Sequence, residues 1–149
     1  MKLSSLVSPD RIVDLKSRTK SDILKEMFRV IERSPDILNK NAFEKSLIER
    51  ENLLTTGIGN EIAIPHVQTD VVKGMVIAIG RCPEGVDFDS LDGKPVKIVI
   101  MIASSNQQPR TEFLKVLAKI VNLFREESFR KKILKAKDQK EIIELLESS

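Results

Sequence analysis

The sequence predicts an α/β protein in which helices cover a mixed β-sheet, folded as a single domain over residues 1–149. Three observations lead to this prediction. The apolar runs at residues 71–79 and 96–103 are short and continuous, as in strands that are buried on both faces. Other stretches place apolar residues at helical spacing, and the two kinds of stretch do not alternate strictly. A chain of 149 residues without an internal repeat or a linker is long enough to bury one core.

The first third of the chain predicts one strand and two helices. The strand is expected at residues 11–15, after a lead-in that a Pro-Asp pair interrupts. Ser21 is the candidate N-cap of the first helix, because an apolar stripe at helical spacing follows over residues 23–31 and ends at a Ser-Pro pair. The second helix begins near residues 39–41 and ends in the charged cluster at residues 49–51.

The remainder of the chain predicts three further strands and three further helices. The expected order is a short strand at residues 62–64, a polar turn at 68–70, a strand at 71–79, a loop at 81–95, a strand at 96–103, a polar loop at 104–110, a helix opened by Pro109 and running to Phe124, and amphipathic helices at 129–136 and 138–146.

The charge balance makes a nucleic-acid-binding protein a weak alternative. The 25 Lys and Arg residues are offset by 22 acidic residues along the same segments, so the net charge is only +3 and the pI is near 9.0. The chain contains neither Trp nor Tyr to stack on bases, and no zinc-finger or RNP-like spacing. We therefore expect no nucleic-acid partner, and solubility alone accounts for the charge.

The counts of cysteine and histidine limit the metal and redox chemistry that the chain can carry. One Cys and one His make a zinc site improbable, because such sites take three or four protein ligands. Cys82 has no partner for an intramolecular disulfide, which fits a reducing cytoplasm. No apolar run is long enough to span a bilayer, and the first residues show no secretory signal pattern. We expect a cytoplasmic protein without a metal or other cofactor and without direct membrane insertion.

The stretch from Thr55 to His66 is the candidate functional site. It ends on the only histidine of the chain, a side chain that can act as a proton carrier or as a nucleophile near neutral pH. Gly57 and Gly59 permit positive φ and close backbone approach, so the turn can expose its N–H groups. Pro65 then stiffens the entry to the histidine. A rigid strand end that presents an imidazole suits covalent catalysis.

Three polar residues before the histidine are candidates for supporting an anion. Arg50 could place its planar guanidinium near a transferred phosphate, and Thr56 and Asn60 supply short hydrogen-bonding groups. Other interpretations stay open, since an Arg at a charged helix end is often solvated or paired with Glu49 or Glu51. Thr and Asn in such turns cap the backbone more often than they bind phosphate. The chain has no nucleophile elbow, Walker motif or Rossmann glycine pattern, so a hydrolase or a nucleotide-dependent kinase is unsupported.

Four segments together resemble a known family. Arg50-Glu51, Thr56–Asn60 and Ile62–His66, followed by the Gly85–Val96 stretch GVDFDSLDGKPV, are similar to the enzyme IIA domain of the phosphoenolpyruvate-dependent sugar phosphotransferase system, fructose/mannitol type, which includes nitrogen-regulatory relatives. The segments agree in order and spacing, and the resemblance extends over essentially the whole chain. It implies the α/β sandwich fold of that enzyme IIA type.

The resemblance also implies a function. As a phosphotransferase component, His66 would accept a phosphoryl group from the phosphocarrier protein HPr and pass it to a cysteine of a IIB domain or permease for sugar uptake. Arg50, Thr56, Gly57 and Asn60 would support the phosphoryl group. The alternative is a regulatory, nitrogen-type enzyme IIA that binds partner proteins according to its phosphorylation state. Cys82 is not the expected acceptor cysteine, because no basic cluster lowers its pKa.

The chain departs from the family pattern at three positions. Many members carry a second histidine near the phosphorylated one, and that position falls at Phe113 here. Val67 replaces the small residue that usually follows the active histidine, and Glu61 stands where Gly is common. These departures favour a divergent or regulatory member.

Overall fold

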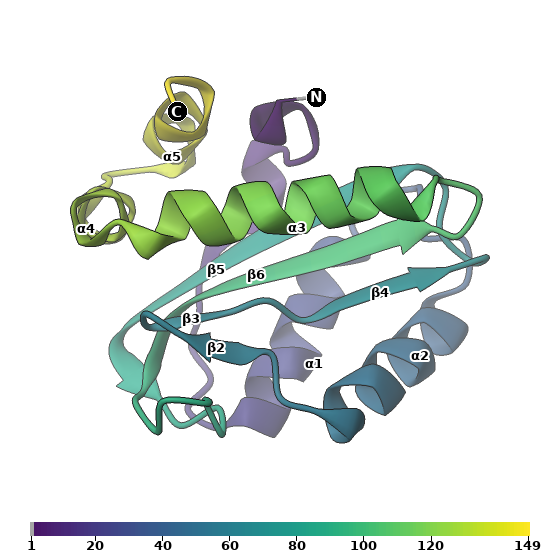
Figure 1. Cartoon of the computed structure of the whole chain (residues 1–149), viewed down its shortest axis with the longest axis horizontal. Coiled ribbons are helices and arrows are strands. Elements are labelled where there is room, and N and C mark those ends of the chain that lie inside the picture. Colours follow the sequence, from purple (N-terminus) through teal and green to yellow (C-terminus); the bar gives the residue numbers. More distant parts are fainter. Residues whose placement is uncertain (1) are drawn as a thin grey trace.

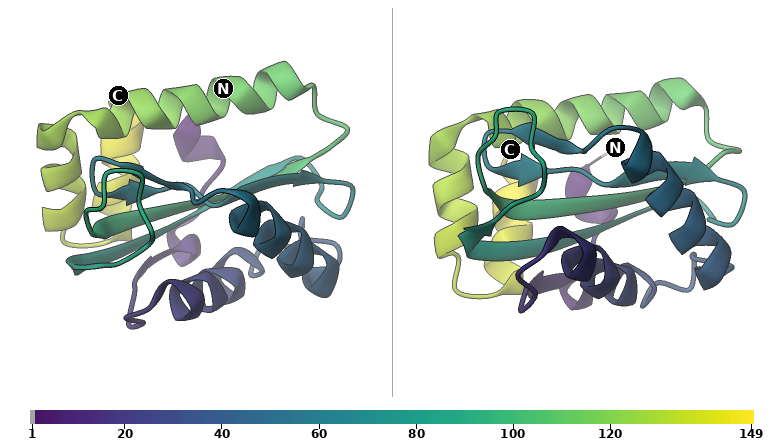
Figure 2. Two further views of the ribbon diagram at one scale, coloured as in Figure 1. Left: turned by 60° about the horizontal axis from the view of Figure 1, so that its bottom comes forward. Right: turned by 90° about the horizontal axis from the view of Figure 1, so that it is seen from below.

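The computed structural model describes residues 2–149 and shows three layers, with a six-stranded mixed sheet between two layers of helices (Figure 1). Helices α1 (Lys20–Ile31) and α2 (Lys40–Leu53) cover one face of the sheet. Helices α3 (Arg110–Arg125), α4 (Glu127–Lys135) and α5 (Gln139–Glu147) cover the other, as Figure 2 shows from two further directions. The predicted fold class is confirmed. The strands are β1 (Ile12–Asp14), β2 (Gly57–Gly59), β3 (Ile62–Ala63), β4 (His66–Thr69), β5 (Met75–Val86) and β6 (Val96–Ser105).

Strands β5 and β6 form the antiparallel centre of the sheet. Strand β1 runs parallel to β5 on one side. On the other side, β3 and β4 follow one another along the same edge of β6 and both run parallel to it, with Ile62 opposite Ile98 and His66 opposite Ile102. Strand β2 is the outermost strand and pairs antiparallel with β3. The chain between β3 and β4 therefore interrupts one edge of the sheet.

Both faces of the central strands are buried, as their continuous apolar sequences predict. Ile77 and Ile79 of β5 point into the core beneath α3, α4 and α5, whereas Val76 and Ala78 point into the core that α1 and α2 cover. Side chains alternate between the two faces of a strand, so an uninterrupted apolar run supplies two cores at once. This alternation explains why neither face of β5 or β6 carries a polar stripe.

The predicted strand at residues 71–79 is wrong at its start. Strand β5 begins at Met75, and the two valines before it belong to a turn that pairs with the segment ahead of α2. The N–H of Leu38 donates to the carbonyl of Val71 at 2.8 Å, and the N–H of Lys73 donates to the carbonyl of Asp36 at 2.8 Å. The valines are apolar because they close the core beneath α2, which local periodicity does not distinguish from a strand.

The predicted loop at residues 81–95 is wrong over residues 81–86, where β5 continues. A bulge lies around Pro83, since the register shifts between Arg81 and Val86. Arg81 looked like a loop residue but is buried. Its Nε donates to Asp14 at 2.8 Å, and Nη1 donates to the carbonyl of Ala136 at 2.8 Å. A guanidinium whose Nε and Nη1 are hydrogen-bonded is tolerated inside a strand, and only the tertiary structure supplies these partners.

Side-chain N-caps begin three of the helices. Asn39 caps α2, which starts within the expected range of residues 39–41, and Asp138 caps α5; each accepts from the N–H group three residues on. Helix α1, however, begins at Lys20, and its cap is Thr19, whose hydroxyl accepts from the N–H of Asp22 at 3.2 Å. Ser21 lies inside the first turn, so its prediction as the cap is wrong by two residues.

A pH-dependent carboxylate pair lies between α1 and α2. Oε2 of Glu32 is buried with no donor partner, and burial followed by the neighbouring Glu44 raises the pKa of Glu32 from its ordinary value of 4.5 to about 8, against a smaller opposing effect of Lys40. Between pH 4.5 and about 8, the folded state therefore keeps a proton on Glu32 that the unfolded state has lost. Because the folded state binds more protons in this range, the protein becomes less stable as the pH rises from 4.5 to about 8.

We therefore expect Glu32→Gln to be more stable than the original protein at pH 8 and close to it at pH 4.5, as measured by urea unfolding. Glutamine stays neutral and removes the repulsion that ionised Glu32 meets from Glu44. Glu49→Gln, an exposed change of the same charge on α2, is the matched control and should keep the original pH slope. An unchanged slope in Glu32→Gln would contradict the assignment.

Candidate functional site

His66 is the first residue of β4 and follows the interruption between β3 and β4. At that interruption the N–H of Ile64 donates to the carbonyl of Thr56 at 2.9 Å, so it turns toward the segment that leads into β2. The carbonyl of Pro65 then resumes the pairing with β6 by accepting from the N–H of Ile102 at 2.9 Å. Since proline has no N–H to offer a ladder, Ile64-Pro65 is a natural break in the strand. The carbonyl of Ile64 is left facing the histidine ring.

The contact between His66 and Ile64 determines the tautomer of the imidazole. Nδ1 of His66 lies 2.7 Å from the carbonyl oxygen of Ile64. A carbonyl oxygen can only accept, so Nδ1 carries the proton in this hydrogen bond. Nε2 is then the ring nitrogen with a free lone pair. The local backbone therefore selects Nε2 as the nucleophilic atom.

The surroundings keep the imidazole neutral at pH 7. Burial is the largest influence and lowers the pKa of His66 below its ordinary value. The hydrogen bond to Ile64 and the charge of Glu51 raise this pKa, whereas Arg50 and Arg110 lower it further, and the net shift is downward. A neutral, half-buried imidazole is competent as a nucleophile without first losing a proton.

Phe113 of α3 forms one wall of the site. Its ring centroid lies 5.8 Å from that of His66, with the two planes tilted by 55°. The position at which many family members carry a second histidine is therefore adjacent to His66 in space. Here it offers an apolar ring and no hydrogen-bonding group, so any anion on Nε2 is neutralised from elsewhere.

Two guanidinium groups on different helices lower the pKa of His66 through their charge. Arg50 lies at the end of α2, where its Nη1 donates to the carbonyl of Leu54 at 3.0 Å. Arg110 is the first residue of α3, and its Nη1 lies 3.5 Å from Oε1 of Gln68. Gln68 is two residues after His66 in β4, so both side chains project from the same face. Each cation opposes a positive charge on His66, and the same charge would favour an anion on Nε2.

Arg110 is a site residue that the sequence interpretation missed. Nothing in the local pattern distinguishes it from the other basic residues of the helices. The usable signal is topological: β4 pairs with the end of β6, and α3 starts five residues after β6 ends. The first turn of α3 therefore has to return over the strand that carries His66.

Thr56 lies in the interior and contributes indirectly. Its hydroxyl donates to Oε1 of Glu51 at 2.5 Å, and its N–H donates to Oε2 of the same carboxylate at 2.8 Å. Thr56 is only 2% exposed, and both of these donors are taken up by Glu51. Its carbonyl, in contrast, holds the N–H of Ile64. Thr56 thus positions the peptide that orients His66.

Gly57 and Gly59 do not form a turn together, because residues 57–59 are a short strand. Gly59 does have positive φ, 100°, and the turn itself is at Asn60 and Glu61. Gly57 is needed for close approach: a Cβ there would lie 2.5 Å from Oγ of Ser90. Its N–H donates to the hydroxyl of Thr55 at 3.1 Å. The backbone here fits the loop before β6 rather than presenting free N–H groups.

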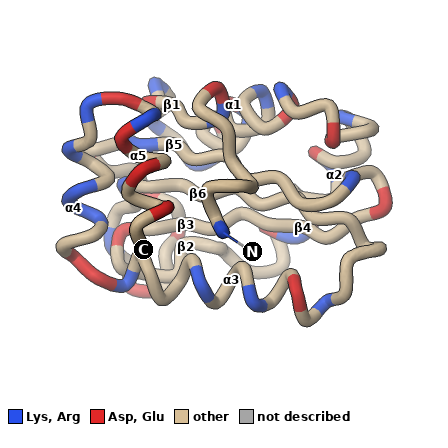
Figure 3. The backbone as a smooth tube through the Cα atoms, turned by 90° about the horizontal axis from the view of Figure 1, so that it is seen from above, with Lys and Arg blue, Asp and Glu red and all other residues tan. Residues whose placement is uncertain are grey.

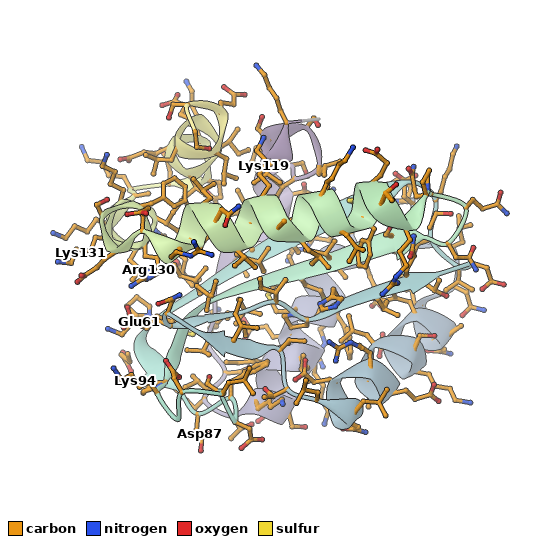
Figure 4. All side chains as sticks on the ribbon, in the orientation of Figure 1. Glu61, Asp87, Lys94, Lys119, Arg130 and Lys131 are labelled. Carbon is orange, nitrogen blue, oxygen red and sulfur yellow. The ribbon has the colours of Figure 1, made fainter. Side chains whose placement is uncertain are left out.

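Asn60 is not brought to the histidine. It lies in the β2–β3 turn with φ of 56°, and the strand after that turn runs along β6 from Ile62 to His66, four residues or roughly 13 Å at ~3.3 Å per residue. Its neighbour Glu61 pairs with Lys97 at 3.0 Å and with Arg130 of α4 at 3.8 Å. Figure 4 labels Glu61 and Arg130 side by side at that end of the molecule. Asn60 belongs with this distant cluster.

Replacing either arginine by glutamine is expected to raise the pKa of His66, and replacing both should raise it more. Each guanidinium opposes protonation of the imidazole, so removing it favours the charged form. The measurement is a pH titration of the His66 ring by NMR. Lys119→Gln, on the exposed face of α3 (Figure 4), is the control and should leave the titration unchanged. A fall in pKa in Arg50→Gln or Arg110→Gln would contradict the proposed arrangement.

The described part of the chain offers little else at this site. Within residues 2–149, no three His, Cys, Asp or Glu side chains are grouped so that they could hold a metal ion. None of the helices in that range is sufficiently long and apolar to cross a membrane. Cys82 is buried, its thiol lies 3.4 Å from the carbonyl of Val96, and burial raises the pKa of Cys82 to about 11. The thiol is therefore unreactive at neutral pH.

The sequence and structure were compared with known proteins. Residues 6–149 match the family model described as "Phosphoenolpyruvate-dependent sugar phosphotransferase system, EIIA 2". The fructose-specific EIIABC component of Bacillus subtilis is 34% identical over 98% of this chain, which spans 23% of that protein's length. The crystal structure of nitrogen regulatory protein IIA-Ntr from Neisseria meningitidis has a TM-score of 0.89 and 29% identity, covering 97% of this chain and 98% of that one.

A third comparison concerns the fold alone. The mannitol enzyme IIA of Escherichia coli, solved in complex with phosphorylated enzyme IIB, superposes with a TM-score of 0.81 at 22% identity. That superposition covers 95% of this chain and 97% of the other. The same fold is therefore found in a relative named for mannitol and in a relative named for nitrogen regulation.

Proposed function

The chain belongs to the EIIA 2 family of the phosphoenolpyruvate-dependent sugar phosphotransferase system, and we propose that His66 is its phosphoryl acceptor and donor. One observation carries this proposal beyond family membership. The hydrogen bond from Nδ1 to the carbonyl of Ile64, at 2.7 Å, leaves Nε2 unprotonated and fixed in direction. The single nucleophile of the site is thus ready for in-line attack on a phosphorus atom.

The proposed transfer needs no base. The lone pair of Nε2 forms a bond to the phosphorus of the donor's phosphohistidine, while the donor's P–N bond breaks and its electron pair returns to the donor imidazole. Nδ1 keeps its proton on the carbonyl of Ile64 throughout. The phosphorylated ring then carries one positive charge beside a dianionic phosphoryl group. In transfer to a IIB cysteine, the thiolate sulfur of the acceptor forms a bond to phosphorus while the P–Nε2 bond breaks and its electron pair returns to Nε2.

The two arginines supply the electrostatic part of the mechanism. Phosphoryl transfer depends mainly on positioning and on neutralising the charge on the equatorial oxygens. Arg50 and Arg110 are the cations that act on His66, and a guanidinium matches phosphate oxygens well. Thr56 and Gly57 support the transfer through the backbone, and Asn60 takes no part in it.

The surface beside His66 suits protein partners. Leu53 and Leu54 at the end of α2 are 83% and 58% exposed, and Leu114, next to Phe113 in α3, is 46% exposed. Apolar residues around a charged centre are typical of the core of an interface. We propose that HPr, as donor, and a IIB domain or permease, as acceptor, dock here in turn. The E. coli mannitol complex with phosphorylated IIB gives a precedent in a relative.

A regulatory role is the second candidate, and Phe113 is the observation that favours it. An apolar ring 5.8 Å from His66 replaces a side chain that could stabilise the phosphohistidine, and the N. meningitidis structure that resembles this chain is a nitrogen regulatory protein. Such a protein is phosphorylated at His66 but passes the group to no sugar-specific IIB domain. It acts in the cytoplasm by binding partners according to its phosphorylation state.

The proposal is tested by incubating the protein with enzyme I, HPr and phosphoenolpyruvate. We expect one phosphoryl group per chain, stable in base and labile in acid, with nitrogen NMR placing it on Nε2. The phosphoprotein is then offered to purified IIB domains of the fructose and mannitol types. Loss of the label to IIB supports transport, and its retention supports regulation. No labelling, or labelling on Nδ1, would reject the proposed site.

A further inference from the structure

A cleft lies between the beginning of α1 and the end of α2. These two helices cover the face of the sheet opposite α3 (Figure 2). The cleft has a volume of about 340 Å³, which lies in the range of small-molecule sites. Leu24, Phe28 and Ile48 form its apolar walls. Ser21 and Asn52 add hydrogen-bonding groups at the rim. Phosphoryl transfer at His66 makes no use of this cleft.

The floor of the cleft is a buried ion pair. Nζ of Lys20 lies 2.8 Å from Oε2 of Glu51, and the Glu51 side chain is 3% exposed. The ammonium also sits 4.9 Å from the ring centroid of Phe88 and 3.4 Å from the hydroxyl of Thr55. Toward the opening it faces the exposed carboxylate of Asp89 at 4.0 Å, which is longer than a hydrogen bond. Lys20 therefore keeps one donor direction that a ligand could occupy.

This floor is linked to the nucleophile by short contacts. Glu51 accepts from both the N–H and the hydroxyl of Thr56, at 2.8 and 2.5 Å. Thr56 in turn accepts from the N–H of Ile64 at 2.9 Å, and the carbonyl of Ile64 holds Nδ1 of His66 at 2.7 Å. The charge of Glu51 also acts on His66 directly. A change at Lys20 is therefore felt at the imidazole both through bonds and through charge.

We propose that the cleft binds a small organic anion with an apolar body, and that its occupancy adjusts the nucleophile through Lys20 and Glu51. The apolar body packs between α1 and α2, and the anionic group takes the open side of Lys20 in place of Asp89. Lys25, at the rim, adds a second cation. The binding half of this proposal is independent of phosphoryl transfer. The regulatory half rests on the proposed function of His66.

Phenyl phosphate is the probe, and the full chain labelled with ¹⁵N is the sample. We expect saturable shifts at Lys20, Leu24 and Asn52 and linked shifts at Thr56 and Ile64. The pKa of His66 should rise in the saturated protein, because the bound anion competes for Lys20 and leaves the charge of Glu51 less neutralised. This experiment contains neither enzyme I nor HPr, so it tests binding at the cleft independently of phosphorylation. Failure of the binding assay and failure of the phosphorylation assay can therefore be told apart.

Two charge variants test the recognition of the anion. Asp89→Asn removes the carboxylate that competes for Lys20 and should tighten phenyl phosphate binding by roughly threefold, the effect of one solvent-screened charge. Lys25→Gln should weaken it by a similar factor. Both residues are exposed, so neither change is expected to disturb folding. Unchanged affinity in both variants would contradict recognition of an anion.

Two tryptophan variants test the location. Ile48→Trp fills the mouth of the cleft and should weaken binding by at least about tenfold through a steric clash. Leu38→Trp is the matched control, because Leu38 is an exposed apolar residue that does not line the cleft, and it should bind normally. The ¹⁵N spectrum of each variant without ligand reports its folding.

Several outcomes would overturn the proposal. Equal binding of phenol would show that the anion is not recognised, and equal binding of inorganic phosphate would show that the apolar walls contribute nothing. Shifts confined to Arg50, His66 and Arg110 would place the phosphate at the nucleophile instead. Binding at the cleft without a change in the pKa of His66 would reject the regulatory half. The absence of a saturable shift at roughly 10 mM phenyl phosphate would reject the whole proposal, because that concentration detects even a dissociation constant of about 1 mM.

Discussion

Replacing His66 by alanine is expected to abolish phosphoryl acceptance. The protein contains no other histidine, and its single cysteine is a buried thiol whose pKa is raised to about 11, so no second nucleophile can take over. Removing the nucleophile of a covalent mechanism costs at least ~10³-fold in rate, which brings labelling to the background of the assay. The measurement is radiolabel from phosphoenolpyruvate, in the presence of enzyme I and HPr.

Two controls make this result specific. His66 is half-buried, so the free energy of unfolding of His66→Ala should lie within about 1 kcal/mol of that of the original protein. Urea unfolding measures this difference and shows that the variant is folded. Asn60→Gly, in the same stretch of sequence, keeps the positive φ of the turn and should be labelled within about twofold of the original. Full labelling of His66→Ala would show that His66 is not the phosphoryl acceptor. A large loss of labelling in Asn60→Gly would show that Asn60 contributes to the site.

Replacing Glu51 by alanine is expected to be the most destabilising single change near the site. It removes one partner of a buried ion pair and leaves Lys20 and both donors of Thr56 without their acceptor. Breaking a buried pair costs about 3–5 kcal/mol, and the partial exposure of Lys20, 21% of its side chain, places this change near the lower end. Urea unfolding measures the loss. Labelling of the folded fraction should also fall, because Thr56 no longer holds the peptide of Ile64.

Glu51→Gln separates packing from charge. The amide keeps the shape and one acceptor for Thr56, so about half of the stability loss should be recovered. The pKa of His66 should fall further below its ordinary value, because the negative charge that raises it is gone. If Glu51→Gln matched Glu51→Ala in stability and left the His66 titration unchanged, the proposed coupling between the two residues would be wrong.

Where sequence prediction failed, the missing information lay in distant contacts. The continuation of β5 through Arg81 depends on Asp14 and on carbonyls from α4 and the loop after it, more than 50 residues further along the chain. A residue that needs partners so far away looks like a loop residue in its own segment. The cap of α1 was misplaced for a different reason: Thr19 and Ser21 are both good caps by type. Only the backbone conformation, extended at Thr19, separates them.

The residues of the candidate site also differ in whether the sequence alone indicates them. The sequence indicates His66 because its signal is local: glycines, a proline and the only histidine lie within one short stretch. Asn60 belongs to the same short stretch, yet it lies in the turn before Ile62, and the strand from Ile62 to His66 spans roughly 13 Å along β6. Arg110 lies 44 residues after His66, and Figure 3 shows charged residues over every helix, so neither position nor charge marks it out. Folding alone brings it beside β4.

The sequence by itself determined the class of fold and the family and indicated His66 as the proposed nucleophile, because apolar periodicity and a compact motif are properties of neighbouring residues. The tertiary structure decided which nitrogen of His66 keeps a free lone pair, which cations lower its pKa and which buried carboxylate is linked to it. These depend on the break between β3 and β4 and on the packing of α2 and α3 around one strand. Hydrogen bonds and charges act through space, so residues far apart in sequence set the chemistry of the one that carries the motif.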